Sequence, residues 1–348
     1  GVPCIVKIPR MRSWSPEDPF LYDVHIKMGG DTVESYFAMR KIEVKNDKNG
    51  IPRIFLNNEP YFQKGVLDQG YWPDGLYTPP CDEAMIYDIQ KMKDLGFNMI
   101  RKHIKIEPQR WYYHCDRIGM LVWQDMVNGG REYKSWYVTY MATAMEGAHI
   151  RAKDTRLHLM GRQDPAGQKQ FESEMKETIR CLYNHPSIVT WVIFNEGWGQ
   201  FNTKKMTDIA MADDHSRLTD SASGWFDQGC GDIRSIHDYF FPLHVTPEKR
   251  VMALTEFGGY SLQIPKHSMY EKDIYGYKIF KRRKELTRGY EKLIKKLIIP
   301  NISRGLSATV YTQLSDIEEE VNGILSYDRK IVKIDENVVK KWNEKLHF

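Results

Sequence analysis

The sequence contains no run of about 18 consecutive apolar residues, so no segment has the length of a membrane-spanning helix. Its first residues, GVPCIVKIPR, lack a basic segment followed by an apolar one, so no secretory leader is visible, although an upstream region is expected to be missing. Charge of one sign is also lacking, because 50 basic residues face 46 acidic ones and the net charge is +4. We therefore expect neither a membrane nor a nucleic acid as a partner.

Cysteine is scarce, and its placement excludes two common uses. The five cysteines are odd in number and widely spaced, with no CxxC pair and no metal-ligand spacing among them. Free thiols in a reducing compartment are the simplest interpretation, which favours a cytoplasmic location. They are Cys4, Cys81, Cys115, Cys181 and Cys230.

The composition is that of a folded globular protein. Apolar residues make up 41% of the 348 residues, which is enough for a sizeable core, and the length suits either one large domain or a barrel with a smaller module. One dense basic run, residues 278–296, carries apolar residues at helical spacing, so we interpret it as a solvated helix face and not as a polyanion site.

The first 45 residues differ in pattern from the rest. FLYDVHIKM and ESYFAMRKIEV alternate apolar and polar residues around a Gly-Gly-Asp turn, which predicts a β-hairpin from the end of a small sandwich. The polar, turn-rich run NDKNGIP follows at residues 46–52. We predict a sandwich fragment over residues 1–45 and a second domain over residues 46–348.

In the second domain, short apolar runs alternate with helical stretches, which is the pattern of repeated βα units around a parallel sheet. Eight such units close a (β/α)8 TIM barrel, an α/β fold. The predicted strands are Gln63–Leu67, Met99–His103, Leu121–Gln124, Val189–Asn195, Leu218–Ser221, Arg234–Asp238, Val251–Glu256 and Ala308–Gln313.

Two other segments of the second domain stand out. Met85, Ile89, Met92 and Leu95 follow Asp82 at helical spacing, so a helix is predicted with Asp82 as its cap. A long insertion, residues 131–170, interrupts the βα rhythm after the third unit. Such an insertion shapes a substrate cleft or a partner surface more often than it builds a separate core.

Two glutamates end predicted strands in the same way. Glu196, in WVIFNEGWGQ, follows an apolar strand and precedes glycines, and Glu256, in VMALTEFGGYS, does the same. Strand ends of this kind meet at the mouth of a barrel, where a retaining glycosidase needs two facing carboxyl groups about 5–5.5 Å apart. The alternative for either residue alone is a helix cap or a partner for a surface base.

At this point the chain resembles glycoside hydrolase family 2, which contains β-galactosidases, β-glucuronidases and β-mannosidases. SWSPEDPFLYDV and SYFAMRKIEV are similar to the end of that family's immunoglobulin-like domain. IFLNNEPYFQKGV, LGFNMIRKHIKIEP and YYHCDRIGMLVWQD are similar to its first three barrel strands. The resemblance covers nearly the whole chain and implies a catalytic barrel preceded by part of an immunoglobulin-like sandwich.

The resemblance also implies roles for individual residues. Asn195-Glu196 matches the family's acid/base motif and Glu256 its nucleophile. Arg101 and Tyr239 match residues that hydrogen-bond the nucleophile, so Glu256 is expected to be held anionic.

His103 matches a histidine beside the sugar, and Asn195 is expected to bond the sugar's 2-hydroxyl. Burial and the neighbouring anion should raise the pKa of Glu196 and keep it protonated, ready to act as an acid.

Aromatic residues gather near the predicted strand ends, where a ring can pack on the C–H face of a sugar and exclude water. For any one of them the alternative is a core or rim position. Tyr311, in ATVYTQ, falls where the resemblance has a tryptophan under the sugar. The candidate sugar contacts are Trp72, Trp198, Trp225 and Tyr311, with Asp68 from the same loop as Trp72.

Departures from the family pattern narrow the expected chemistry. Some β-galactosidases carry magnesium ligands after the third strand, but MVNGGR, which follows VWQD here, lacks the histidine and acid of that site. We therefore predict no metal and no other cofactor. EEVNGILSYDRK lacks the Asn-x-Lys pair that binds a carboxylate in β-glucuronidases and has Asn322, Gly323 and Ile324 at that point. This disfavours a glucuronide, unless another basic residue takes the place of the lysine. His114, His185 and His237 have no mutual metal spacing and are interpreted as structural.

The resulting hypothesis is a retaining exo-β-glycosidase that releases a terminal β-linked sugar, β-galactosidase-like, with a carbohydrate as its partner and homo-oligomerisation left open. The alternative is a barrel that binds carbohydrate without cleaving it, or a truncated fragment whose pocket is incomplete.

Overall fold

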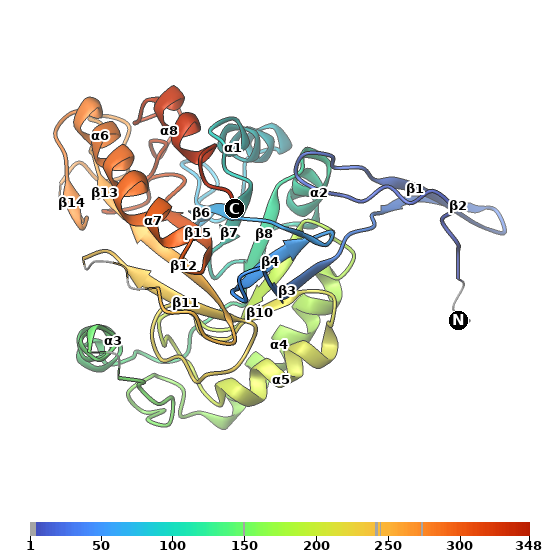
Figure 1. Cartoon of the computed structure of the whole chain (residues 1–348), viewed down its shortest axis with the longest axis horizontal. Coiled ribbons are helices and arrows are strands. Elements are labelled where there is room, and N and C mark those ends of the chain that lie inside the picture. The colour runs from blue at the N-terminus through green and yellow to red at the C-terminus, as the bar shows by residue number, and fades with distance from the viewer. Residues whose placement is uncertain (1–4, 149, 241–242, 244, 273) are drawn as a thin grey trace.

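Eight parallel strands close into a barrel in the computed structural model, which describes residues 5–148, 150–240, 243, 245–272 and 274–348 (Figure 1). All eight predicted strands are confirmed, with ends that differ by a few residues, and the α/β TIM barrel is confirmed with them. Around the barrel they are β6 (Gln63–Asp68), β7 (Met99–Lys102), β8 (Leu121–Asp125), β9 (Ile188–Val192), β10 (Leu218–Asp220), β11 (Ile233–Asp238), β12 (Val251–Gly258) and β15 (Leu306–Thr312).

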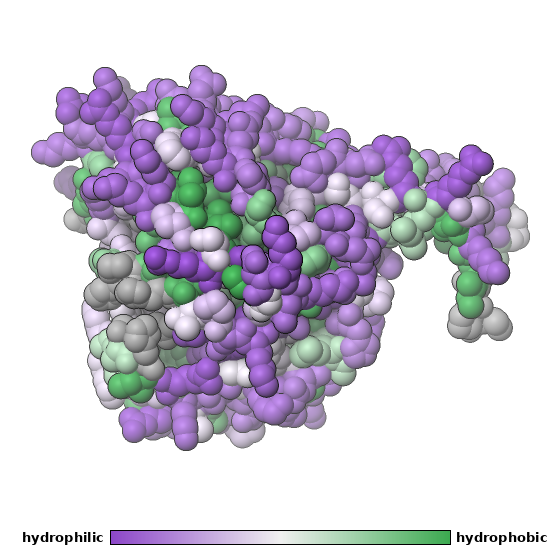
Figure 2. Space-filling view, viewed as in Figure 1, coloured by the Kyte–Doolittle hydropathy of each residue, from purple (hydrophilic) through white to green (hydrophobic). Residues whose placement is uncertain are grey.

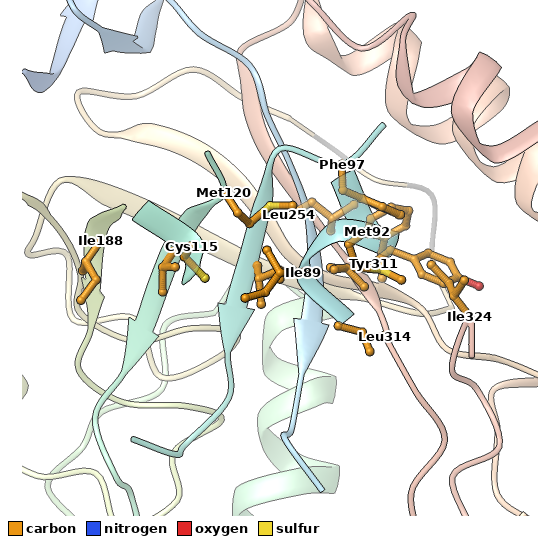
Figure 3. Packing of buried hydrophobic residues seen from close by; sticks show 14 of the residues in the cluster. Ile89, Met92, Phe97, Cys115, Met120, Ile188, Leu254, Tyr311, Leu314 and Ile324 are labelled. Atoms are coloured by element: carbon orange, nitrogen blue, oxygen red, sulfur yellow. The ribbon is translucent and has the colours of Figure 1, made fainter. Parts of the chain in front are cut away.

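Side chains alternate between the two faces of the strands, and this alternation builds two cores. One core fills the barrel and includes Leu67, Met99 and Val310. The other lies between strands and helices and includes Val66, Ile100 and Tyr311, some of whose members Figure 3 shows. The position of a residue in this alternation therefore decides whether its side chain points into the barrel or toward the outer helices.

The helices that surround the barrel follow the predicted rhythm. The predicted helix after the first unit begins at Asp82, but its N-cap is Cys81, so Asp82 lies in the first turn and is not the cap. The helices are α1 (Asp82–Asp94), α2 (Gln109–Ile118), α4 (Pro165–Leu182), α5 (Thr203–Asp213), α6 (Arg283–Leu293), α7 (Ile299–Ile302) and α8 (Glu336–Asn343), with a π-helical turn, η2 (Ile294–Ile298), after α6. Across the described ranges, no helix is both long enough and apolar enough to cross a membrane.

The N-terminal strands form two small antiparallel sheets. β1 (Tyr22–Met28) and β2 (Asp31–Phe37) pair as the predicted hairpin, which projects away from the barrel (Figure 1). Figure 2 shows mostly hydrophilic residues on the visible face of the barrel and a mixture of hydrophilic and hydrophobic residues along this hairpin. β3 (Ile42–Asn46), β4 (Pro52–Leu56) and β5 (Glu59–Pro60) form the second sheet. The predicted division between residues 45 and 46 falls within β3, and the assignment of residues 1–45 to a sandwich stays a prediction.

The insertion at 131–170 folds against the loops of the barrel mouth. It contains a π-helical turn, η1 (Trp136–Met141), and α3 (Ala142–Gly147); residue 149 lies outside the described ranges. Tyr137, Val138 and Met160 of the insertion pack with Trp225 and Phe226 in one buried cluster. The insertion thus supports the loops that follow β9 and β10.

Two smaller predictions can be compared with the structure. The lysines and arginines of α6 and η2 are exposed while their apolar neighbours are buried, so this part of the basic run at 278–296 is a solvated helix face. Cys81, Cys115, Cys181 and Cys230 are free thiols, and Cys4 lies outside the described residues.

Candidate active site

Glu196 and Glu256 face each other at the carboxyl ends of the barrel strands. Glu256 lies in β12, and Glu196 lies four residues beyond the end of β9. One carboxylate oxygen of each, together with a ring nitrogen of His237, all lie within 4.8 Å of one another. The two acids therefore share one pocket.

Two donors fix the carboxylate of Glu256. Arg101 Nη1 donates to Oε1 at 3.2 Å, and the hydroxyl of Tyr239 donates to Oε2 at 2.7 Å. The Tyr239 hydroxyl also lies 3.0 Å from Oγ1 of Thr312, at the end of β15, and its ring stacks on Tyr277 with centroids 3.7 Å apart. Each oxygen of Glu256 thus has its own donor, which restricts rotation of the carboxylate.

Arg101 connects Glu256 to the neighbouring strands. Its guanidinium donates to both oxygens of Asp125, at 3.0 and 2.9 Å, and to Oδ1 of Asn195 at 2.7 Å. Burial alone would raise the pKa of Asp125, but Arg101 and His103 together lower it below its usual value. The amide nitrogen of Asn195 is buried and has no hydrogen-bond partner among the described residues, so it is free to donate to a ligand in the pocket.

Histidine and tryptophan side chains line the site on the side of Glu196. His103 Nδ1 lies 3.3 Å from Asp125 Oδ2, and the His103 ring meets the edge of Trp198 with centroids 6.1 Å apart. Trp225 donates from Nε1 to the backbone oxygen of Glu196 at 3.0 Å. Trp198 and Trp225 therefore lie at the site, with Trp225 holding the loop that carries Glu196.

His237 belongs to the site, which corrects its interpretation as a structural histidine. Its Nδ1 lies 2.9 Å from Glu196 Oε1 and 3.6 Å from Glu256 Oε2. Burial lowers the pKa of His237 to about 4, so the ring is neutral near pH 7 and only one nitrogen carries a proton.

The hydrogen bonds behind His237 determine which nitrogen that is. Thr255 Oγ1 donates to the Ile236 carbonyl at 3.3 Å, and Ser223 Oγ donates to Thr255 Oγ1 at 2.9 Å. With both hydroxyl hydrogens used, the 2.9 Å contact between Ser223 Oγ and His237 Nε2 requires the ring to donate. Nδ1 is then an acceptor, and its partner, Glu196 Oε1, must carry the proton.

The electrostatics of Glu196 agree with that assignment. Burial raises its pKa to about 7, an effect that His103 and Arg101 only partly oppose. The backbone of Glu196 is left-handed, with φ of 50°, and Gly197 continues the turn with φ of 75°. Such a conformation costs of order 1–3 kcal/mol in a residue other than glycine and is typical of functional sites.

Comparisons with known proteins agree with this geometry. The family model of glycosyl hydrolases family 2, TIM barrel domain, matches residues 79–256, which is more than half of the chain. The chain belongs to glycosyl hydrolase family 2. A β-galactosidase of Leuconostoc mesenteroides is 26% identical over 236 residues, covering 66% of this chain and 20% of that protein. A putative β-glucuronidase of Formosa agariphila is 28% identical over 197 residues, covering 55% of this chain and 16% of that protein.

Solved structures show the same fold. A β-galacturonidase from Eisenbergiella tayi, bound to galacturonate, superposes with a TM-score of 0.70 at 19% identity, covering 98% of this chain and 61% of that one. A β-D-glucuronidase of Dictyoglomus thermophilum gives a TM-score of 0.69 at 14% identity, covering 95% and 59%. The chain spans about a fifth of the length of the curated family-2 relatives it matches.

Three predicted sugar contacts of this family-2 barrel lie elsewhere, and the predictions are corrected. Asp68 is on the outer face of β6, where its carboxylate pairs with Lys102. Trp72 is buried under the guanidinium of Arg329, 4.2 Å from its ring centroid. Tyr311 packs in the outer core against Phe257 and Tyr290. Figure 3 shows Tyr311 among other members of that core.

Other residues of the family-2 site were missed, although strand periodicity offered a signal for two of them. Asp125 follows Trp123 by two residues on β8, and His237 precedes Tyr239 by two residues at the end of β11, so each shares a face with an inward residue. Glu320 lies in the loop after β15, where no periodicity applies.

Glu196, His237 and Glu256 also have the spacing of three metal ligands. The guanidinium of Arg101 already places a positive charge against Glu256, and Nδ1 of His237 already accepts the proton of Glu196. Both contacts disfavour a cation at this point, and the expectation that no metal takes part stays a prediction.

Proposed function

We propose that this chain is the catalytic barrel of a retaining exo-β-glycosidase, with Glu256 as nucleophile and Glu196 as acid and then base. The observation that supports this most directly is the separation of no more than 4.8 Å between an oxygen of each carboxyl group. Retaining enzymes place their carboxyl groups about 5–5.5 Å apart, whereas inverting enzymes leave about 6.5–9.5 Å for a water molecule.

In the first step Glu256 attacks the anomeric carbon while Glu196 protonates the departing oxygen. Arg101 and Tyr239 aim the attacking carboxylate, since each bonds one of its oxygens. Glu196 starts protonated because burial raises its pKa to about 7. The bond to the leaving group breaks as the ester between sugar and Glu256 forms.

In the second step water attacks the sugar carbon of that ester. The negative charge of Glu256 is gone at this stage, so the ionised form of Glu196 is favoured and can take a proton from the water. The free amide nitrogen of Asn195 suits the 2-hydroxyl of the sugar, a contact that strengthens as the ring flattens in the transition state. Glu256 is then released for the next cycle.

A β-galactoside is the substrate we propose, because several curated relatives, including those of Leuconostoc mesenteroides and Lactococcus lactis, carry the name β-galactosidase. Trp198 and His103 stand beside Glu196 and are proposed to contact the sugar. The protein is proposed to act in the cytoplasm on a carbohydrate, without a metal or other cofactor.

The test is the anomeric form of the first product. Purified protein is incubated with an aryl β-galactoside, and proton NMR follows the released sugar before it mutarotates. Release of the β anomer supports double displacement, and release of the α anomer contradicts it. If the protein binds the sugar and releases none, the second candidate, a carbohydrate-binding barrel or an incomplete fragment of a longer enzyme, is correct.

A further inference from the structure

Three polar side chains form a group beside the proposed nucleophile that no part of the proposed reaction uses. Gln69 follows the last residue of β6, Gln313 follows the last residue of β15, and Glu320 lies in the loop beyond. β6 and β15 are neighbours in the barrel, and β15 is also next to β12, which carries Glu256. We call Gln69, Gln313 and Glu320 the amide-acid wall.

The wall is linked directly to the proposed catalytic groups. Gln313 is adjacent in sequence to Thr312, whose Oγ1 contacts the Tyr239 hydroxyl that bonds Glu256. Burial and the negative charge of Glu256 raise the pKa of Glu320 to about 7, while His103 and a hydrogen bond from Asn322 oppose the shift. The ionisation of Glu320 is therefore coupled electrostatically to that of the proposed nucleophile.

The amide N–H groups of the wall all donate to neighbouring side chains. Gln313 Nε2 donates to Glu320 Oε2 at 2.9 Å and to Asn322 Oδ1 at 2.8 Å. Gln69 Nε2 donates to Gln313 Oε1 at 3.0 Å and to Glu320 Oε2 at 3.3 Å. An amide nitrogen has only two hydrogens, so both amides are fully used by the wall and by Asn322.

The atoms that remain are acceptors. The Asn322 side chain also donates to Glu320, and no lysine or arginine within the described ranges pairs with the wall. Arg101, the cation that pairs with Glu256, is already shared with Asp125. Above about pH 7, where Glu320 is ionised, a hydroxyl can donate to its carboxylate and to Oε1 of Gln69, whereas an ionised carboxylate cannot donate and would be repelled.

We infer that the amide-acid wall is a specificity site that binds hydroxyl groups of a neutral hexose and rejects a hexuronic acid. The inference rests on the proposed function, because it places the sugar ring over Glu256. It separates this chain from its solved structural neighbours that are named β-galacturonidase and β-glucuronidase.

The test compares aryl β-galactoside with aryl β-galacturonide, and aryl β-glucoside with aryl β-glucuronide. The wild-type protein should have the higher kcat/KM for the neutral member of each pair. At pH 8, where Glu320 is mostly ionised, Glu320→Gln removes the charge but keeps the shape, and should reduce the ratio of neutral to acidic kcat/KM about tenfold or more, because like charges across a binding site cost several kcal/mol. Glu319→Gln, at the exposed neighbouring residue, should leave the ratio unchanged.

A ratio that stays constant in Glu320→Gln, or a wild-type preference for either uronide, would overturn the inference without affecting the proposed reaction. Binding of free galactose and galacturonic acid by saturation-transfer NMR separates the two proposals. If no glycoside is cleaved but galactose binds in preference to galacturonic acid, and Glu320→Gln removes that preference, the proposed function fails and the wall remains a specificity site. Equal binding of both sugars by the wild-type protein rejects the wall.

Discussion

His237 accepts a hydrogen bond at Nδ1 from Oε1 of Glu196 over 2.9 Å, so a neutral imidazole holds the protonated carboxyl of the proposed acid. Ser223 and Thr255 behind the ring impose this tautomer, since their hydroxyl hydrogens are directed away from Nε2. His237 is therefore a positioning residue for Glu196.

Replacing His237 should affect the acid step selectively. His237→Ala removes the acceptor and admits water beside Glu196, and both changes lower the pKa of that carboxyl. We expect the basic limb of the kcat/KM profile to move to lower pH, and turnover of glycosides with poor leaving groups to fall more than that of activated ones. His215→Ala, at an exposed histidine, is the control and should leave both readouts unchanged. A uniform loss with an unmoved pH profile would indicate a purely structural role.

The wild-type pH profile should report Glu196. Because its pKa is raised to about 7, the acid form is complete well below pH 7 and is lost as the pH rises through that value. For substrates with poor leaving groups, kcat/KM should therefore decline above about pH 7. In Glu196→Gln this basic limb should disappear, and its persistence would assign the titration to another group.

The two glutamates should differ in how they depend on the leaving group. Glu196→Gln should reduce turnover of poor leaving groups about 10²–10⁴-fold while sparing activated aryl glycosides far more, because only poor leaving groups require protonation.

Glu256→Gln should abolish turnover of both substrate classes, since the nucleophile is needed whatever the leaving group. Circular dichroism and thermal unfolding should show that both variants are folded. Equal losses for both classes in Glu196→Gln would contradict the acid assignment.

Arg101 should be important for stability as well as for activity. Its guanidinium is completely buried and pairs with Asp125 and Glu256, so Arg101→Met would leave two buried acids without their cation. Removing one partner of a buried pair costs about 3–5 kcal/mol, which urea unfolding would measure as a loss in the free energy of unfolding. Arg110→Met, at an exposed arginine paired with Asp82, should cost less than about 1 kcal/mol. A similar loss in both variants would argue against the buried network.

The sequence predicted the barrel well because each strand is a short apolar run between helical stretches, and this pattern needs no knowledge of distant contacts. Glu196 and Glu256 were also predictable as a pair, since both follow such runs. The predictions for Asp68 and Tyr311 failed because a shift of one residue along a strand moves a side chain to the other face. Leu67 and Val310 point into the barrel, so Asp68 and Tyr311 point out of it.

Loop residues were beyond prediction for a different reason. Trp72 lies under Arg329, which is more than 250 residues away in sequence, and no local sequence pattern predicts that contact. Glu320 reaches Gln69 across a similar separation. The amide-acid wall exists only because the closing of the barrel brings its first and last strands together.

The guanidinium of Arg101 touches Asp125 on β8, the loop residue Asn195, and Thr255 and Glu256 on β12. Since one buried cation joins these separate segments at the barrel mouth, none of them can loosen on warming without exposing the others. Warming should therefore release Asp125, Asn195, Thr255 and Glu256 from their places together, as the barrel melts, and not one segment at a time.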